Sequence, residues 1–381
     1  MDSFPHILMM IESSRESGRR LISGVADYAR HFGPWQFHWN PQGEVYRAKA
    51  LEAGRFDGAL IRDDVDASAL VDAGIPVVVF SYSKHRHSGI GWVNTDDHGL
   101  SKGVANHFLQ RGFRHFAFFG SAAWPWAVRR CEGFSEALRK SGFEADVYPG
   151  IEPSLERFDD ADVVRWLQGL PRPVALMAAN DDLGLKVVEL CREAGLRVPY
   201  DCAVVGVDND PCVCGLSNPS LSSVGIDQYQ SGYLAAEMLG NMMKGTAPEN
   251  LVITAKTGEL VVRQSSDIVA VDNEAVVKAL RFIQNNAHRA LTSDEVALAS
   301  GLYRRGLERG FRTHLSCTIK EYCREARATH LENILRESRE SLEKIAGQCG
   351  FAQASHLTRF FTSVRGETPS NYRKRIALRQ G

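Results

Sequence analysis

The sequence predicts an α/β region with two lobes, followed by an all-α domain that contains two helix-turn-helix units. Short β-branched runs alternate with amphipathic helices from about residue 6 to residue 262 of the 381-residue chain, which is typical of βαβ units with parallel sheets. The remaining residues show helical periodicity, with glycines at the expected turns. The two regions also carry opposite net charge, which favours two domains with different partners.

The α/β region begins with an apolar run that we interpret as a first strand. Residue 2 is acidic, residue 5 is proline, and no basic flank or cleavage pattern is present, so a signal peptide is not expected. Strands and helices should then alternate. The expected strands are Ile7–Ile11, Gly58–Ile61, Val77–Phe80, Phe116–Gly120, Val174–Ala178 and Ala203–Val207. The expected helices are Arg19–Arg30, Gly99–Gln110, Ala127–Lys140, Asp160–Leu170, Leu183–Glu193 and Tyr229–Met243.

The length of this region predicts a ligand cleft. About 260 residues are many for one open sheet, so we expect a division near Gly112 into two similar lobes. Ligands of such sheets bind beyond the carboxyl ends of the strands. A two-lobed protein of this class therefore has its binding site in the cleft between the lobes.

Polar and aromatic side chains follow several of the expected strands. Carboxylates, amides and guanidinium groups match vicinal hydroxyls, and an indole face covers the C–H face of a sugar ring, so we expect a neutral polyol as the ligand. A nucleotide is less suitable, because no glycine-rich phosphate loop is present. The candidate effector-binding residues are Ser14, Arg15, Trp124, Trp126, Arg130, Asn180, Asp181 and Asp208.

Several of these residues also have a purely structural interpretation. Asn180 and Asp208, at the ends of expected strands, could cap the next helix or turn. Trp124 and Trp126 flank a proline and could pack between the lobes. Arg130 could be a solvated surface charge.

A helix-turn-helix pattern spans Ser341 to Arg373. Apolar residues recur at helical spacing before Gly350, which suits a sharp turn because glycine tolerates positive φ. The segment Ala354–Val364 then has one apolar face and one polar face, and the polar side chains are available to base edges and phosphates. Gly366 and Pro369 are expected to end this second helix.

The helix-turn-helix pattern alone is weak, because an ordinary helical hairpin also has glycine in its turn. A degenerate second copy strengthens it, with glycines 49 residues apart, at 301 and 350. The segment Thr318–Arg339 between the copies predicts a long amphipathic helix that holds two such units together. Val296, Gly301, Leu307 and Phe311 of the first copy correspond to Ile345, Gly350, Leu357 and Phe361 of the second.

Charge is distributed unevenly along the chain. Of its 45 Lys+Arg and 46 Asp+Glu, the residues from Ala275 to Gly381 contain 19 and 10, a net of +9. The residues before Ala275 contain 26 and 36, a net of −10. The basic end of the chain thus has the electrostatic character of a protein that binds the phosphate backbone.

The C-terminal region resembles the AraC-type (AraC/XylS) family of bacterial transcription regulators over roughly Asn273 to Arg375. The motifs that carry the resemblance are IAGQCGF, HLTRFF, GETPSNYR and LYRRGLERGF. The resemblance implies two recognition helices, which begin near Arg304 and Ala354 and enter successive major grooves. Our candidate DNA-binding residues are Arg304, Arg305, Arg309, Gln353, Ser355, His356 and Arg359.

Three positions depart from the AraC-type pattern. Tyr303 stands where Ser or Thr usually caps the first recognition helix, Gly310 replaces a usual basic residue, and Ser316 replaces a usual glycine. A lost cap and a helical glycine each cost about 1 kcal/mol. We therefore expect the first helix-turn-helix unit to be the less rigid of the two.

The α/β region resembles the periplasmic-binding-protein-like effector domain of the lactose/galactose-repressor family. The motifs include VNTDDHGLSKGVANHFLQRGFRHFAFFG, RRCEGFSEALRKSGF and ALMAANDDLGLKVVELCREAGLRVPYDCAVVGVDND. The resemblance places Arg130, Asn180 and Asp208 at positions that contact the effector. That family normally carries one helix-turn-helix at the N-terminus, whereas this chain starts directly at the first effector strand.

An effector domain of this kind followed by a C-terminal AraC-type domain resembles the xylose-operon regulator family. This resemblance implies an activator in which xylose or a related pentose, bound in the cleft, favours a homodimer that engages operator DNA, with RNA polymerase as a further partner. We expect residues 1–264 to form the two-lobed effector domain, residues 265–275 a linker and residues 276–381 the DNA-binding domain. The helix-turn-helix units should lie at about 291–315 and 341–365.

Other classes of protein are less consistent with the sequence. A sugar-modifying enzyme lacks support, because no nucleophile elbow, metal set or phosphate loop is recognisable, and we expect no catalytic residue and no cofactor. A transport-type sugar-binding protein would not use the basic C-terminal region. The eight cysteines include one C-x-C, at 212 and 214, without a second ligand pair, so reduced thiols are expected rather than a metal site. With no apolar stretch near 18 residues, we expect a cytoplasmic protein with no membrane partner.

Overall fold

The computed structural model describes two compact units of the chain, Met1–Ile268 and Val269–Gly381. Within them it describes residues 4–39, 41, 56–62, 67–80, 89–149, 158–246, 251–268, 270–271, 273–315 and 317–380. The first unit is α/β and the second is all-α, which confirms the predicted fold class. The expected linker, 265–275, begins inside the first unit, because Ser265 and Ser266 are fully buried there.

The first lobe of the α/β unit is built on a six-stranded parallel sheet in the order β11-β5-β4-β3-β1-β2. Alternate residues of its central strands pack on opposite faces, so both faces are buried. The strands are β1 (His6–Met10), β2 (Gln36–Trp39), β3 (Gly58–Arg62), β4 (Val77–Phe80), β5 (Gly91–Thr95) and β11 (Val252–Ala255). The helices are α1 (Glu16–Phe32), α2 (Ser68–Asp72) and α8 (Gln228–Met243).

The second lobe repeats this design with the order β12-β10-β9-β8-β6-β7, in which only β12 is antiparallel to its neighbour. Its strands are β6 (His115–Phe119), β7 (Ala145–Val147), β8 (Val174–Ala178), β9 (Cys202–Asp208), β10 (Ser222–Ile226) and β12 (Thr257–Val261). Its helices are α3 (Asp97–Gln110), α4 (Pro125–Arg139), α5 (Asp160–Gly169), α6 (Asp181–Glu193) and α7 (Pro211–Leu216).

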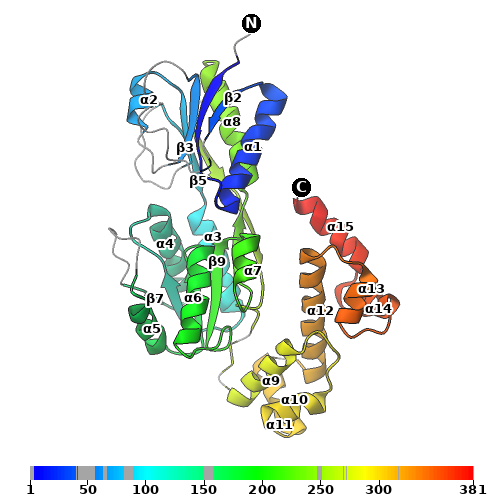
Figure 1. Ribbon diagram of the computed structural model, residues 1–381. Coiled ribbons are helices and arrows are strands. Elements are labelled where there is room, and N and C mark those ends of the chain that lie inside the picture. Colours follow the sequence, from blue (N-terminus) through cyan, green and yellow to red (C-terminus); the bar gives the residue numbers. More distant parts are fainter. Residues whose placement is uncertain are drawn as a thin grey trace. The chain divides into compact units, whose positions relative to one another are not determined.

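The predicted division near Gly112 is wrong, because the chain passes between the lobes just after β5. Helix α3 packs against α4 in the second lobe, and α8 returns to the first lobe, where it lies beside α1 (Figure 1). Two glycines permit this close packing of α1 on α8. A Cβ at Gly24 would lie 2.0 Å from the Tyr229 carbonyl oxygen, and one at Gly232 would lie 2.1 Å from that of Leu21.

The second unit consists of seven helices among its described residues. They are α9 (Glu274–Asn285), α10 (Ser293–Ser300), α11 (Arg304–Leu315), α12 (Ile319–Glu337), α13 (Leu342–Gln348), α14 (Ala354–Arg365) and α15 (Pro369–Gln380). Helix α12 contacts α10 and α11 of the first helix-turn-helix and α14 of the second. Capping boxes at Thr292 and Thr318 fix the starts of α10 and α12.

The internal repeat defines the cores of both helix-turn-helix units. Gly301 and Gly350 have φ values of 75° and 65°, as a sharp turn between helices requires. The paired apolar residues are fully buried: Val296, Leu307 and Phe311 in the first unit, and Ile345, Leu357 and Phe361 in the second. Gly366 ends α14 as predicted, whereas Pro369 begins α15, because proline at the first helical position lacks only an N–H that has no helical partner. No described helix is long and apolar enough to span a membrane.

Candidate functional site

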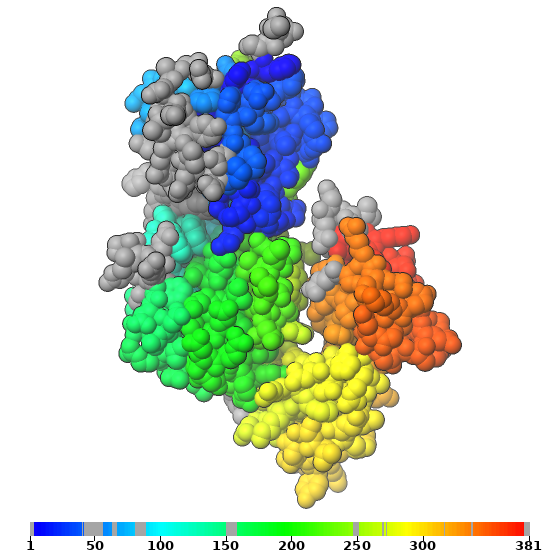
Figure 2. Space-filling view, in the orientation of Figure 1, coloured from blue at the N-terminus to red at the C-terminus, as the bar shows by residue number. Residues whose placement is uncertain are grey.

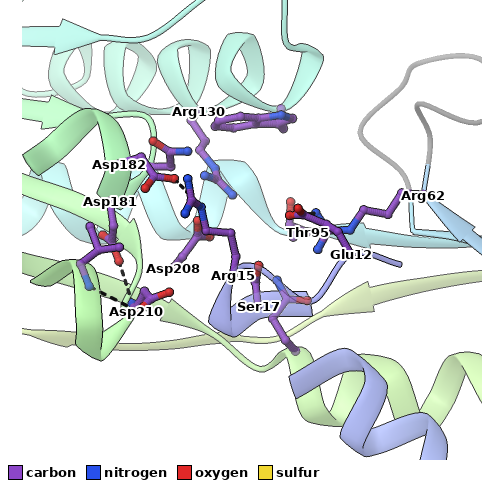
Figure 3. Close-up of a pocket in the computed structure, with 14 residues that line it drawn as sticks. Glu12, Arg15, Ser17, Arg62, Thr95, Arg130, Asp181, Asp182, Asp208 and Asp210 are labelled. Carbon is purple, nitrogen blue, oxygen red and sulfur yellow. Dashed lines mark hydrogen bonds and ion pairs between the residues drawn. The ribbon is translucent and has the colours of Figure 1, made fainter. Parts of the chain in front are cut away.

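A polar pocket of about 200 Å³ lies between the two lobes of the first unit (Figure 3). The ends of β1, β3 and β5 form one side, and α4, α6, α7 and the loop after β9 form the other. Its volume is below the roughly 300–1,000 Å³ of sites for drug-sized ligands, so it suits a smaller molecule. The lining residues are Glu12, Arg15, Ser17, Arg62, Thr95, Trp126, Arg130, Asn180, Asp181, Asp182, Asp208, Asp210, Val213 and Gln228.

Six of the eight candidate effector residues line this pocket, and Ser14 and Trp124 do not. The Ser14 hydroxyl donates to a Glu12 carboxylate oxygen at 2.6 Å. Trp124 stacks on Trp126, with the ring centroids 5.3 Å apart and the planes 8° from parallel. These two residues therefore support neighbours that do reach the pocket.

Arg130 is a buried residue of the pocket and is not a solvated surface charge. Its side chain is 3% exposed, and its Nε donates to Asp97 Oδ1 at 3.0 Å. Its Nη1 donates to the Ala179 carbonyl oxygen at 2.6 Å, and its guanidinium carbon lies 4.7 Å from the centre of the Trp126 ring. A guanidinium fixed in this way is positioned in advance to donate to a ligand oxygen.

Asp97 organises this side of the pocket, although the sequence did not single it out. It is 2% exposed and also accepts from Arg129 Nε at 2.9 Å and from the Thr95 hydroxyl at 2.7 Å. Two arginines balance its buried charge, as a carboxylate at this depth requires. Asp97 could not be predicted from the sequence, because it is the packing of α3 against α4 that brings it beneath Arg130.

Asp208 occupies a strained position at the end of β9. Its φ is 109° and that of the next residue, Asn209, is 53°, and non-glycine residues rarely adopt such values. Burial raises the pKa of Asp208 to about 6, although the positive charges of Arg130 and Arg62 act in the opposite direction. Asp208 is therefore a carboxylate that titrates close to neutral pH.

Asp181 has a structural role within the pocket wall. Its Oδ2 accepts from the Asp210 backbone N–H at 2.8 Å, and its Oδ1 accepts from the Ser223 hydroxyl. Burial, followed by the charge of Asp208, raises its pKa well above the usual value for an aspartate. These bonds hold the loop after β9 in place.

Asn180 caps a helix and also lines the pocket, so its role as an effector contact stays a prediction. Its Oδ1 accepts from the Leu183 N–H at 2.9 Å, so it caps α6, and the same residue lines the pocket. A side-chain amide carries two further donors on Nδ2, which suit a hydroxyl oxygen.

Two contacts close the pocket between the lobes, and neither was expected from the sequence. Arg15 Nε lies 3.0 Å from Asp182 Oδ2. Asp210 Oδ2 accepts from the Glu16 N–H at 3.1 Å, while its Oδ1 accepts from the Cys212 N–H at 2.9 Å and so caps α7. The consecutive polar residues 208–210 were a visible signal in the sequence, but the cross-lobe partner of Asp210 was not.

Six of the seven candidate DNA-binding residues lie on the two recognition helices, and Gln353 is the N-cap of the second. The helices start where the resemblance placed them, at Arg304 and Ala354. The part of the chain that contains α11, in yellow, lies on the surface in Figure 2. Arg304 lies 3.4 Å from Asp294, but both side chains are more than half exposed, so that pair is weak. All seven candidates are exposed: Arg304, Arg305, Arg309, Gln353, Ser355, His356 and Arg359.

Other basic residues of this unit serve its own packing. Arg327 is 9% exposed, donates to the Cys349 carbonyl oxygen at 2.7 Å and lies over the Phe351 ring at 3.7 Å. Arg365 pairs with Glu332 at 2.8 Å and joins α14 to α12. The net charge of +9 therefore overstates the charge that is available to DNA.

Two of the three departures from the AraC-type pattern lie in described residues. Tyr303 is 91% exposed and directly precedes α11. Gly310 faces α9, where an added Cβ would lie 2.7 Å from Val276 Cγ2, so the glycine permits close packing there. Ser316 lies outside the described residues. The eight cysteines are free thiols, and no group of three possible metal-ligating side chains occurs in the described parts of the chain.

Comparison with known proteins covers both units. A periplasmic binding protein-like domain matches residues 105–266, and a helix-turn-helix domain matches residues 296–375. A xylose operon regulatory protein from Escherichia coli is 26% identical over 381 residues, which cover 96% of each chain. The chain is thus similar to xylose operon regulatory proteins over nearly its whole length.

Two solved structures show the fold. The structure of the xylose-binding transcription activator xylR has a TM-score of 0.78 and is 24% identical over 97% of this chain and 98% of that one. A transcriptional regulator CelR–cellobiose complex has a TM-score of 0.57 and is 23% identical over 68% of this chain and 84% of that one. The chain is accordingly a DNA-binding transcription regulator with an effector domain.

Proposed function

We propose that this regulator binds D-xylose or a related pentose in the pocket between its lobes and then activates genes for the use of that sugar. The observation that carries the proposal is the similarity, over 96% of both chains, to a protein named for the xylose operon. The pocket volume of about 200 Å³ is in keeping with a single monosaccharide.

The chemistry of the pocket supports a sugar. A sugar hydroxyl both donates and accepts, and the lining supplies acceptors on Asp208, donors on Arg130, and an amide on Asn180 that offers both. The Trp126 ring provides an apolar face for the C–H groups of the sugar. The same groups give no reason to expect turnover, and we propose no enzymatic activity.

The DNA side of the proposal assigns base and phosphate contacts to α11 and α14. Their exposed polar residues would enter successive major grooves of operator DNA, with three or four of them reading bases and the rest contacting phosphates. We further propose that the active form is a homodimer, that it recruits RNA polymerase and that it works in the cytoplasm, where its DNA target lies.

Thermal unfolding of the full-length chain against a panel of pentoses and hexoses tests the effector. A sugar at one hundred times its dissociation constant adds about 2.7 kcal/mol to the stability of the domain that binds it. We expect D-xylose to raise the unfolding temperature more than L-arabinose, D-ribose or D-glucose. A shift with another sugar alone would replace xylose as the effector, and no shift with any sugar would contradict a sugar-binding role for the pocket.

A further inference from the structure

The loop after β9 makes three different contacts through three consecutive residues. Asp208 lines the pocket, Asn209 is bound by Arg263, and Asp210 accepts the Glu16 N–H from the first lobe. The first two of these residues have positive φ. A strained loop of this kind persists only where its surroundings over-determine it, and such loops concentrate at functional sites.

Arg263 ties this loop to the last residues of the first unit. Its Nη2 donates to Asn209 Oδ1 at 2.8 Å, and its Nη1 donates to the Leu221 carbonyl oxygen at 2.9 Å. The side chain is only 8% exposed. From the opposite side, the Asn209 N–H donates to the Ser223 hydroxyl at 2.9 Å, so Asn209 is held at both its backbone and its side chain.

The residues that follow Arg263 are bound to the same strands. The Ser265 hydroxyl donates to the Val204 carbonyl oxygen at 2.6 Å and accepts from the Ser222 N–H at 2.8 Å. Ser266 lies 3.0 Å from the buried His107 ring, which belongs to α3. The first unit ends at Ile268, five residues after Arg263, and the second unit begins at the next residue.

We propose that the Asn209–Arg263 hydrogen bond couples the effector pocket to the segment that leads into the DNA-binding unit, which makes Arg263 a positioning residue for regulation. This inference rests on the proposed function. Closure of the lobes on a sugar acts on Asp208 and Asp210, and Asn209 between them transmits the displacement to the Arg263 side chain. The bond thus joins two sites through one contact that substitution can remove.

The test compares the full-length wild type with Asn209→Gly, Asn209→Asp and Arg263→Lys. Glycine removes the acceptor but tolerates the positive φ, and aspartate keeps an acceptor oxygen. Lysine loses the fork that reaches Leu221 and Asn209 together. For each protein, the affinity for D-xylose is measured by calorimetry. Its affinity for a DNA duplex, selected in vitro for binding to the wild-type protein, is measured with and without saturating D-xylose.

We expect D-xylose to change the DNA affinity of the wild type about tenfold or more. In Asn209→Gly, D-xylose should change the DNA affinity by no more than about twofold. In Arg263→Lys the effect of D-xylose should be reduced. In Asn209→Asp the effect should stay within about threefold of the wild-type value. All variants should still bind D-xylose. A merely structural contribution of the bond would lower the unfolding temperature and leave the coupling ratio unchanged.

The outcomes separate the inference from the proposed function. If D-xylose has no effect on the wild type, the proposed function is wrong and the coupling falls with it. If the wild type responds and Asn209→Gly keeps the same ratio, only the coupling is wrong. If Asn209→Gly no longer binds D-xylose, the residue belongs to the pocket itself, which also contradicts the coupling role.

Discussion

The protonation of Asp208 links the pocket to the pH of the solution. Burial raises its pKa to about 6, so the folded protein holds this proton more tightly than the unfolded chain does. The neutral form is favoured in the folded state. The stabilisation that this provides is therefore complete below the unfolded pKa near 4 and is lost as the pH rises through 6.

Sugar binding should show the opposite pH dependence, because only the ionised Asp208 accepts two hydroxyl protons. We expect the affinity for D-xylose to fall about tenfold between pH 7 and pH 5, as a pKa near 6 implies. Asp208→Asn should weaken binding by about tenfold to a hundredfold and flatten the profile. Calorimetry over this pH range measures both. The same slope in the variant would assign the titration to another group, such as Asp181.

The two stacked tryptophans provide a matched pair of substitutions. Trp126 lines the pocket, whereas Trp124 only stacks on it. Trp126→Ala should lower D-xylose affinity about tenfold, because it removes the apolar face and the ring beneath Arg130. Trp124→Ala should cost at most about threefold. Equal losses in a calorimetric titration would mean that the stack acts as one unit and that neither ring alone faces the sugar.

The elements of the fold were largely predictable from periodicity and turn chemistry. The six expected strands and six expected helices all occur within about three residues of their expected bounds. Short elements such as β7 and α2 were not predicted, because three to five residues carry little periodic signal. The expected division near Gly112, which would place α3 in the first lobe and α8 in the second, was wrong for a different reason. Which sheet a helix covers depends on side-chain fit between distant segments, as at Gly24 and Gly232, and local sequence does not encode it.

The candidate pocket shows the same limit. Position at the ends of strands identified Arg130, Asn180 and Asp208, because the topology of α/β sheets brings such ends together. Arg62 was not selected, although it directly follows an expected strand. Thr95 and Gln228 were not found, because each lies at the end of a strand that the sequence did not predict, β5 and β10.

The second helix-turn-helix can be tested at its turn. Gly350 has φ of 65°, so Gly350→Ala should destabilise the second unit by about 1–2 kcal/mol. Gly347 lies within α13 with open space around an added Cβ, so Gly347→Ala should stabilise it by about 0.5–1 kcal/mol. Denaturant unfolding of the two full-length variants compares them. Changes of the same sign would contradict the assignment of Gly350 to the turn.

The recognition helices can be tested through salt dependence. Arg359 is exposed on α14, and loss of one phosphate contact should reduce the slope of log affinity against log salt by about one. Lys278 is exposed on α9, where it pairs with Glu274, and Lys278→Ala removes one positive charge outside the recognition helices. Fluorescence anisotropy with labelled duplex should show an effect of Arg359→Ala only. Equal slopes in the two variants would place α14 away from the DNA.

At the scale of the whole molecule, the two units differ in charge and in architecture. The acidic first unit carries the pocket, and the basic second unit carries two helix-turn-helix cores that the same buried positions define. In a regulator, sugar binding by the first unit must be coupled to DNA binding by the second. A ligand shifts the equilibrium between two conformational states only by its differential affinity for them. A tenfold preference corresponds to about 1.4 kcal/mol.

The most direct measurement is the affinity of the full-length chain for its selected duplex, titrated with D-xylose and, as a matched control, with L-arabinose. Our account predicts that D-xylose tightens DNA binding about tenfold or more, with a midpoint at the sugar's own dissociation constant. L-Arabinose should have no comparable effect. An unchanged DNA affinity in saturating D-xylose, with the sugar shown to be bound, would contradict the claim that the pocket regulates the DNA-binding unit.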